Sequence, residues 1–449
     1  MHRVPLLILC LAVVLTSGCI SPTPFTCKGN EGCVRESGAQ GICEAQGVCS
    51  FPDSACPGSR RRLAAQGNKG ACVPVASCIS HVSVGAGHVC VLRTDNAVYC
   101  WGDNTAGKLG DGTTINRESP VRIDALPHSP QLFVTQVAAG EVQTCALLNT
   151  GAVYCWGANG ARELGNGTAV DRSLTPVQTL ALAADGGTEP FVATVISVGG
   201  KHTCAIGPDK RAYCWGENQS GNHGGQCGVD PMLADDVPVA TEVAGLEGVV
   251  EIGAGDEFTC ARKDDKSLWC WGANGQGELG NGTIADSFRP VNVGGISSVS
   301  SLAVGDESSC ARRADSSVWC WGYGGSGALG NGSLDNGLVP VRVGTADQIG
   351  MGGTGFTVCL IDVEGVLTCF GDNSKGQAGT GSTEPNITTP TPAQLVTVKS
   401  VSTGSANGCA VTLDGALWCW GENDSGQLGQ GPGGVVISRV PVRVNLPCP

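Results

Sequence analysis

Several familiar signatures of enzymes are missing from this 449-residue chain. It has only six His, no HExxH zinc motif, no Gly-rich phosphate loop with its Lys, and no nucleophile elbow. Positive charge is scarce as well, and a net charge of −13 disfavours nucleic acid because an acidic surface repels phosphate. We therefore expect no catalytic residue, metal or cofactor, although a site assembled from distant residues would escape a motif search.

Long apolar runs are also lacking, except at the N-terminus. Residues 6–15 read LLILCLAVVL, about half of the roughly 20 residues that a membrane-spanning helix needs. This run is typical of a signal peptide, which we place at residues 1–18. The sequence Thr-Ser-Gly-Cys that follows resembles a bacterial lipobox and implies that Cys19 carries a lipid anchor. Ordinary cleavage nearby would instead give a freely secreted product.

Cysteine, in contrast, is abundant, with 25 residues. The tripeptide Cys-Trp-Gly (once Cys-Phe-Gly) occurs seven times, and another Cys precedes each copy by nine intervening residues. Two apolar runs flank a turn in each unit, which predicts a hairpin whose two Cys lie opposite each other within disulfide range. The predicted bridges are Cys90–Cys100, Cys145–Cys155, Cys204–Cys214, Cys260–Cys270, Cys310–Cys320, Cys359–Cys369 and Cys409–Cys419.

Each repeat contains about four short predicted strands. A turn-rich Asn/Asp/Gly run follows the tripeptide, then a Pro-Val strand, then an apolar run that leads into the next repeat's first Cys. Four antiparallel strands per repeat make one propeller blade. The residue just before the second Cys is aromatic in every repeat except the one that has Thr368. These aromatic residues, such as Tyr99, are predicted to fill the space between blades.

The repeat resembles that of the regulator of chromosome condensation family. The shared features include Trp-Gly-x-Asn at residues 101–104 and Gly-x-Leu-Gly at residues 107–110, and the resemblance extends over residues 81–445. It implies an all-β, seven-bladed β-propeller. The paired cysteines depart from the nuclear members and favour export, because disulfides persist in oxidising compartments.

The expected domain order is the signal peptide, a lipid-anchored Cys-rich stalk or knob at residues 19–78, and the propeller at residues 79–449. We expect N- and C-terminal strands to close the ring together, with the strand at residues 441–444 completing the blade that begins at Ile79. A Cys78–Cys448 bridge would lock that closure. In the small disulfide-rich segment, Cys56 is expected to pair with Cys72. The other four bridge among themselves: Cys27, Cys33, Cys43 and Cys49. Cys227 is left over.

Unlike residues occupy equivalent positions just before the first Cys of each repeat, which argues against a symmetric metal ring. We expect them to gather on one rim of the propeller as candidates for a binding surface: His88, Glu141, His202, Asp256, Glu257, Phe258, Asp306 and Glu307.

A rigid framework with variable loops favours a binding scaffold over an enzyme. The expected partner is a protein or glycan at the cell envelope, bound by a monomer that touches the membrane only through its lipid. The expected location is the outer membrane or cell surface, or the medium if the product is secreted. Ile20 in place of Asp after Cys19 favours the outer membrane. The alternatives are the guanine-nucleotide exchange activity that the family implies, and a polysaccharide hydrolase or lyase.

Overall fold

The computed structural model describes residues 42–43, 49–52, 59–62, 72–74, 78–220 and 223–446. The chain divides into two compact units, Met1–Val75 and Ala76–Pro449. Every regular element among the described residues is a β-strand, and no described helix is long and apolar enough to cross a membrane. The signal peptide, Cys19 and Cys448 lie outside the described residues, so the predictions made for them stay predictions.

The first unit contains one four-stranded antiparallel sheet with its strands in chain order. Its strands are β1 (Ile42–Cys43), β2 (Cys49–Pro52), β3 (Ser59–Arg62) and β4 (Cys72–Pro74). The register places Cys43 opposite Cys49.

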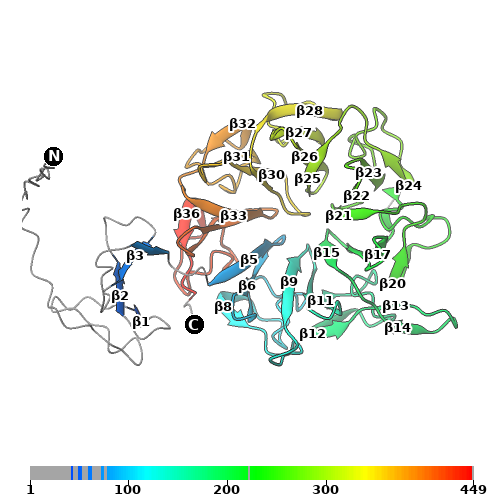
Figure 1. The fold of residues 1–449 in the computed structure, drawn as a ribbon, viewed down its shortest axis with the longest axis horizontal. Coiled ribbons are helices and arrows are strands. Elements are labelled where there is room, and N and C mark those ends of the chain that lie inside the picture. Colours follow the sequence, from blue (N-terminus) through cyan, green and yellow to red (C-terminus); the bar gives the residue numbers. More distant parts are fainter. Residues whose placement is uncertain are drawn as a thin grey trace, which may run out of the picture. The chain divides into compact units, whose positions relative to one another are not determined.

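The second unit is a seven-bladed β-propeller, with the blades arranged around a central channel in chain order (Figure 1). Blade 1 comprises β5 (Ile79–Val84), β6 (His88–Arg93), β7 (Val98–Gly102) and β8 (Arg117–Arg122). Blade 2 comprises β9 (Val134–Ala139), β10 (Gln143–Leu148), β11 (Val153–Ala158) and β12 (Arg172–Gln178). Blade 3 comprises β15 (Val195–Val198), β16 (His202–Ile206), β17 (Ala212–Glu217) and β20 (Asp236–Glu242).

The remaining blades repeat this order. Blade 4 comprises β21 (Val249–Ala254), β22 (Phe258–Lys263), β23 (Leu268–Gly272) and β24 (Ser287–Asn292). Blade 5 comprises β25 (Val299–Val304), β26 (Ser308–Arg313), β27 (Ser317–Gly322) and β28 (Gly337–Thr345). Blade 6 comprises β29 (Gln348–Gly350), β30 (Thr357–Ile361), β31 (Leu367–Asp372) and β32 (Asn386–Pro392). Blade 7 comprises β33 (Val398–Thr403), β34 (Asn407–Thr412), β35 (Leu417–Glu422) and β36 (Ile437–Arg443).

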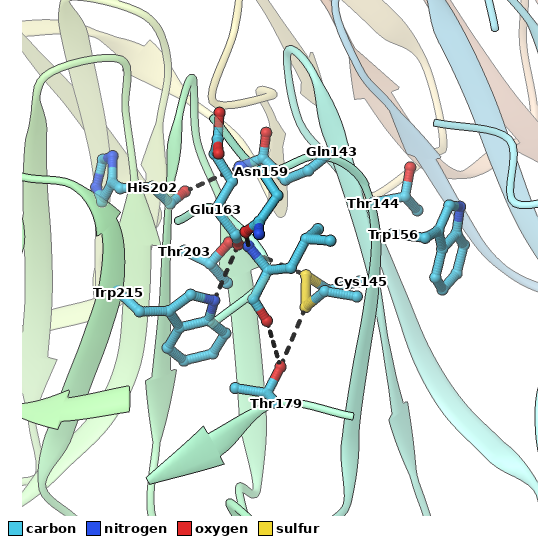
Figure 2. The surroundings of a disulfide bond; sticks show 12 residues. Gln143, Thr144, Cys145, Trp156, Asn159, Glu163, Thr179, His202, Thr203 and Trp215 are labelled. Atoms are coloured by element: carbon cyan, nitrogen blue, oxygen red, sulfur yellow. Dashed lines mark hydrogen bonds between the residues drawn. A yellow bond between two sulfur atoms is a disulfide. The ribbon is translucent and has the colours of Figure 1, made fainter. Parts of the chain in front are cut away.

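All seven predicted hairpin disulfides are present. In every blade the second and third strands place the two Cys directly opposite each other, with Cα atoms 4.0 to 4.2 Å apart. Figure 2 shows the surroundings of one of them. The chain-entropy model gives a loop of this length about 3 kcal/mol of stabilisation per bridge.

The Trp of Cys-Trp-Gly joins each blade to the one before it. Trp215 of blade 3 is fully buried, and its Nε1 donates a hydrogen bond to the carbonyl oxygen of Glu163 in blade 2 at 3.0 Å (Figure 2). The other five Trp of the tripeptide make the same bond, whereas Phe370 fills the position in blade 6 without a donor. Tyr99 and its equivalents are only half-buried, so the buried inter-blade aromatic follows the Cys instead of preceding it.

The ring closes without the shared blade that we expected. The terminal strand β36 pairs with β35 of its own blade, and blade 1 has its own outer strand, β8. The prediction is wrong because blade 6 also has a Pro-containing outer strand, β32, in which Pro390 is followed by Thr391 and not by Val. Each of the seven blades therefore has its own outer strand. Closure uses the same contact as five of the other six blade pairs, since Trp101 Nε1 donates to the carbonyl oxygen of Gln427 at 2.8 Å.

A disulfide-bonded cysteine also lies at the N-terminal end of the ring. Cys78 takes part in a disulfide, but the proposed partner Cys448 lies outside the described residues, so the Cys78–Cys448 bridge stays a prediction.

Blade 3 has two additions to the common plan. A hairpin of β13 (Leu180–Leu182) and β14 (Thr188–Pro190) extends its sheet beyond β20, and a second hairpin joins β18 (Gln219–Ser220) to β19 (His223–Gly224). Cys227 follows this second hairpin and is buried with a free thiol.

Candidate binding rim and acidic cavity

The loops between the first and second strands of the blades meet at one face of the channel. They are linked around the ring by backbone hydrogen bonds, in which the amide of one loop donates to a carbonyl of the next. Glu141 N donates to Gly199 O at 3.2 Å, and Gly200 N donates to Gly255 O at 3.0 Å. The bond from Asp256 N to Asp306 O, at 3.0 Å, continues the series. Adjacent loops are thereby held in fixed positions, which orients the side chains that they carry.

Three of the predicted rim carboxylates come together here. Glu141 of blade 2, Asp256 of blade 4 and Asp306 of blade 5 line one cavity of about 110 Å³. Its other lining residues are Gly200, Thr354 and Ser405. We call this space the acidic cavity. At Gly200 of blade 3 a Cβ atom would overlap the Asp256 carboxylate, so only glycine leaves space for that side chain of blade 4.

Burial and repulsion between neighbouring carboxylates raise the pKa of two of these residues, Asp256 and Asp306. The pKa of Asp306 is raised to about 8, first by burial and then by nearby Asp256, Glu307, Glu141 and Glu257. The pKa of Asp256 is raised to about 6 by burial and by Glu141, Glu257 and Glu217, against the opposing effect of Lys201. The cavity thus concentrates negative charge in a poorly solvated place.

Two lysines lie near the acidic cavity, but each forms an ion pair with a carboxylate that does not line it. Lys108 Nζ is 2.8 Å from Asp103 Oδ2, and Lys201 Nζ is 3.5 Å from Glu217 Oε1. Glu217 is also the main cause of the raised Lys201 pKa. Within the described residues, no ion pair involves any of the three cavity carboxylates.

Glu257 and Glu307 follow Asp256 and Asp306 in the chain and are half-buried beside them. Burial raises the pKa of Glu307, and the charge of Glu257 raises it further. These two residues extend the negative charge beyond the cavity lining.

The other three rim candidates are buried between blades and do not line the acidic cavity. His88, His202 and Phe258 are almost completely buried. His88 Nε2 lies 2.7 Å from Thr144 Oγ1 and His202 Nε2 lies 2.8 Å from Thr259 Oγ1, each in the next blade. Burial lowers the pKa of both imidazoles, that of His202 to about 4. The spacing that predicted a rim position cannot separate a surface residue from an inter-blade contact.

Sequence reasoning missed a loop of blade 6, residues 351–355, which we call the channel loop. Eight residues separate Gly350 from its strand partner Cys359, against six between Ala303 and Cys310 in blade 5. A Cβ on Gly353 would lie 3.1 Å from Val198 O of blade 3, and one on Gly352 would lie 3.1 Å from Val84 O of blade 1. The loop therefore crosses the channel and touches blades on different sides of it.

The channel loop separates two spaces. Beyond Thr354, which lines the acidic cavity, Gly352 and Gly353 line a larger cavity of about 250 Å³ between the first strands of the blades. The two extra residues and their Gly-Gly pair were the sequence signal that could have revealed the loop.

Within the part of the chain that the structure describes, no group of three His, Cys, Asp or Glu side chains is placed to hold a metal ion. What the acidic cavity can do is accept positive charge and hydrogen-bond donors, because its lining is rich in carboxylate and hydroxyl oxygens.

Family comparison identifies the repeats. One model of the Regulator of chromosome condensation (RCC1) repeat matches residues 95–147, 150–206, 265–312, 315–360 and 414–447. A second model of the same repeat matches residues 79–108, 134–161, 194–222, 249–278 and 398–427. Together the matches cover more than half of the chain.

Similar curated proteins match part of the chain. The ultraviolet-B receptor UVR8 of Arabidopsis thaliana is 30% identical over 46% of this chain and 44% of the receptor. The probable E3 ubiquitin-protein ligase HERC6 of Homo sapiens is 28% identical over 46% of this chain and 20% of the ligase. The chain thus matches less than half the length of each of these relatives.

Solved structures share the fold at low identity. Human WBSCR16 aligns with a TM-score of 0.67 and 22% identity, over 78% of this chain and 95% of that one. Prp20p of Saccharomyces cerevisiae, studied with its binding to Gsp1p and histones, aligns with a TM-score of 0.50 and 20% identity, over 82% and 77%. The same yeast protein bound to Kap60 gives a TM-score of 0.51 at 22% identity, over 82% and 75%.

Proposed function

The chain belongs to the regulator of chromosome condensation repeat family, and on that premise we propose that it is a non-catalytic binding scaffold for a protein or glycan partner. It would act at the cell surface, anchored through Cys19, or in the secreted state. One observation carries this proposal: a repeated framework of disulfides and buried Trp supports one face where unlike loop residues surround the acidic cavity. A fixed scaffold with variable loops is how binding surfaces are commonly built.

Two further observations support the proposal. The seven blade disulfides favour an oxidising compartment outside the cytoplasm. The yeast propeller of similar fold is described with protein partners, Gsp1p, histones and Kap60. Fold alone does not transfer a partner, and we take from these proteins only the use of the propeller as a binding platform.

The test compares two faces of the full-length oxidised protein. Glu257→Gln with Glu307→Gln changes the face that carries the acidic cavity. Glu364→Gln with Asp347→Asn removes the same charge from exposed residues near the opposite ends of the strands. Each variant is used for crosslinked capture from envelope and extracellular fractions and for a glycan array.

We expect the first pair to weaken capture of a specific protein or glycan, and the second pair to leave it unchanged. Equal capture by both pairs would contradict a binding face at the cavity. Catalysed guanine-nucleotide exchange or polysaccharide cleavage by the wild-type protein would instead support one of the two alternative functions.

A further inference from the structure

The charge of the acidic cavity is not balanced within the described part of the propeller. Lys108 and Lys201 form their ion pairs with Asp103 and Glu217, so neither forms an ion pair with a cavity carboxylate. The charge of Lys201 offsets that of Asp256 only in part, because the pKa of Asp256 is still raised. Buried carboxylates without counter-charges are costly, and proteins usually pair them. The raised pKa values of Asp256 and Asp306 express this cost. The imbalance would be relieved by a positive group supplied from outside the chain.

A second observation points to a ligand independently of the carboxylates. Thr354 is only 4% exposed, its side chain lines the same cavity, and its Oγ1 has no hydrogen-bond partner among the described residues. An unpaired buried hydroxyl costs free energy that a bound donor would recover. Ser405 Oγ already donates to the backbone carbonyl of Thr354, which leaves the Ser405 oxygen able to accept.

The cavity therefore presents acceptors to an occupant. Carboxylate oxygens and the hydroxyl oxygens of Thr354 and Ser405 suit a group with several N–H donors, three in an ammonium and five in a guanidinium. The channel loop closes the far side, so the occupant must enter from the face where Glu257 and Glu307 lie. A long side chain with a cationic end fits an entrance of this kind, and the outer carboxylates would attract a basic partner surface.

We propose that the acidic cavity receives the ammonium or guanidinium group of a Lys or Arg side chain from a partner protein. This inference rests on the proposed binding function and names the chemistry of the partner. A single metal ion is a poorer occupant, because no three acidic, His or Cys side chains of the described residues are placed to hold one.

The first test measures binding of small probes to the full-length protein by calorimetry. The probes are N-acetyl-lysine methylamide, N-acetyl-arginine methylamide, the uncharged N-acetyl-norleucine methylamide, calcium chloride and glucosamine. We expect a cationic amino-acid probe to bind at least about tenfold more tightly than the norleucine probe, because only the charged head can pair with the carboxylates. Binding should strengthen as pH rises through the pKa values of Asp256 and Asp306, about 6 and about 8.

Substitutions of the lining residues test whether the cationic probe binds in the acidic cavity. Glu141→Gln, Asp256→Asn and Asp306→Asn combined should weaken the cationic probe at least about tenfold. The triple variant is expected to fold, because it removes repulsion. Thr354→Val removes only the unpaired hydroxyl and should weaken binding less. The matched control combines Glu189→Gln, Asp347→Asn and Glu364→Gln at exposed positions, and should bind like the wild type.

Four results would overturn the proposal: equal binding of the norleucine probe, unchanged binding by the triple variant, tighter binding of glucosamine, or calcium displacing the probe from the cavity. Its failure is separable from failure of the proposed function. If wild type and triple variant capture the same partner equally, the scaffold function stands and the cavity assignment fails. If the cationic probes bind but no protein or glycan does, the cavity assignment stands and the scaffold function fails.

Discussion

Two parts of this propeller differ in how strictly their residues repeat. One is the framework, made of the blade disulfides and the buried aromatic residues between blades, and the other is the channel face, where the acidic cavity lies. In the framework the same residues recur: a paired Cys in all seven hairpins and a buried Trp or Phe after the second Cys. At the channel face, equivalent loop positions hold Glu141, Gly200, Asp256, Asp306 and Ser405. Residues that recur hold the ring together, whereas residues that differ between blades line the cavity where we propose that a partner binds.

The glycine of Cys-Trp-Gly belongs to the framework for a backbone reason. Gly216 has a φ of 106°, and a Cβ there would lie 2.5 Å from Lys201 O. That φ is rarely adopted by other residues. The equivalent glycines of the other blades have φ values between 96° and 108°, so the tripeptide ends in glycine in every blade.

The largest effect is expected from breaking the framework at a buried Trp. Trp271→Ala should destabilise the propeller by about 3–5 kcal/mol, because it empties a buried inter-blade site and removes the bond to Gln226 O. Trp271→Phe should cost about 1 kcal/mol, the value of the lost hydrogen bond. Phe370 already fills this position in blade 6.

Urea unfolding followed by circular dichroism would measure these differences. Trp269→Ala is the matched control, since Trp269 lies in the same strand but is half-buried. A loss of stability for Trp269→Ala as large as that for Trp271→Ala would contradict the assignment of Trp271 as the blade-to-blade contact.

The next effect is expected from opening one blade bridge. Cys310→Ser with Cys320→Ser should reduce the free energy of unfolding by about 3 kcal/mol, because the unfolded chain regains the freedom of the closed loop. Cys227→Ser is the control, because Cys227 is the free thiol of the described residues and serine retains a donor for Glu217 O. If both changes have the same effect on the urea midpoint, the bridge adds nothing beyond the loss of a buried side chain.

The framework could be predicted from the sequence, because hairpin disulfides and strand order depend on the spacing of residues within one repeat. Cys310 and Cys320 could be paired from nine intervening residues alone. The acidic cavity could be predicted only in part. Glu141, Asp256 and Asp306 share a repeat position, but Thr354 lies in the longer loop of blade 6, where two extra residues change the spacing to Cys359. His88 was wrongly placed on the rim, because the sequence does not show that its side chain points between blades and contacts Thr144. The closing strand was misplaced because one of seven outer strands, β32, lacks the Pro-Val pair.

Removing one charge from the channel face should stabilise the ring. The folded pKa of Asp306 is about 8 and its ordinary value is 3.8, so the folded state binds the proton more tightly. Stability contributed by this group is therefore present at low pH and lost as pH rises from about 4 to about 8. Asp306→Asn should gain on the order of 1–2 kcal/mol over wild type at pH 9 and much less at pH 4. Thermal unfolding across this range checks the trend, and a gain that shrinks with rising pH would contradict it.

The smallest effect is expected where a blade 3 insertion meets blade 4. His223 Nδ1 lies 2.8 Å from Asp286 Oδ2, and this contact raises the pKa of His223 above 6.5. The raised pKa means that the pair stabilises the fold fully below pH 6.5 and loses that contribution as pH rises through the folded value. Both side chains are partly exposed, so solvent screening limits the gain to a few tenths of a kcal/mol. His223→Ala should lower the thermal midpoint slightly at pH 5.5 and not at pH 8.5. Asp286→Asn should show the same pH dependence, and the double variant should lose no more than either single variant. Additive losses would mean that the two residues act separately, and that the insertion is held to blade 4 by other contacts.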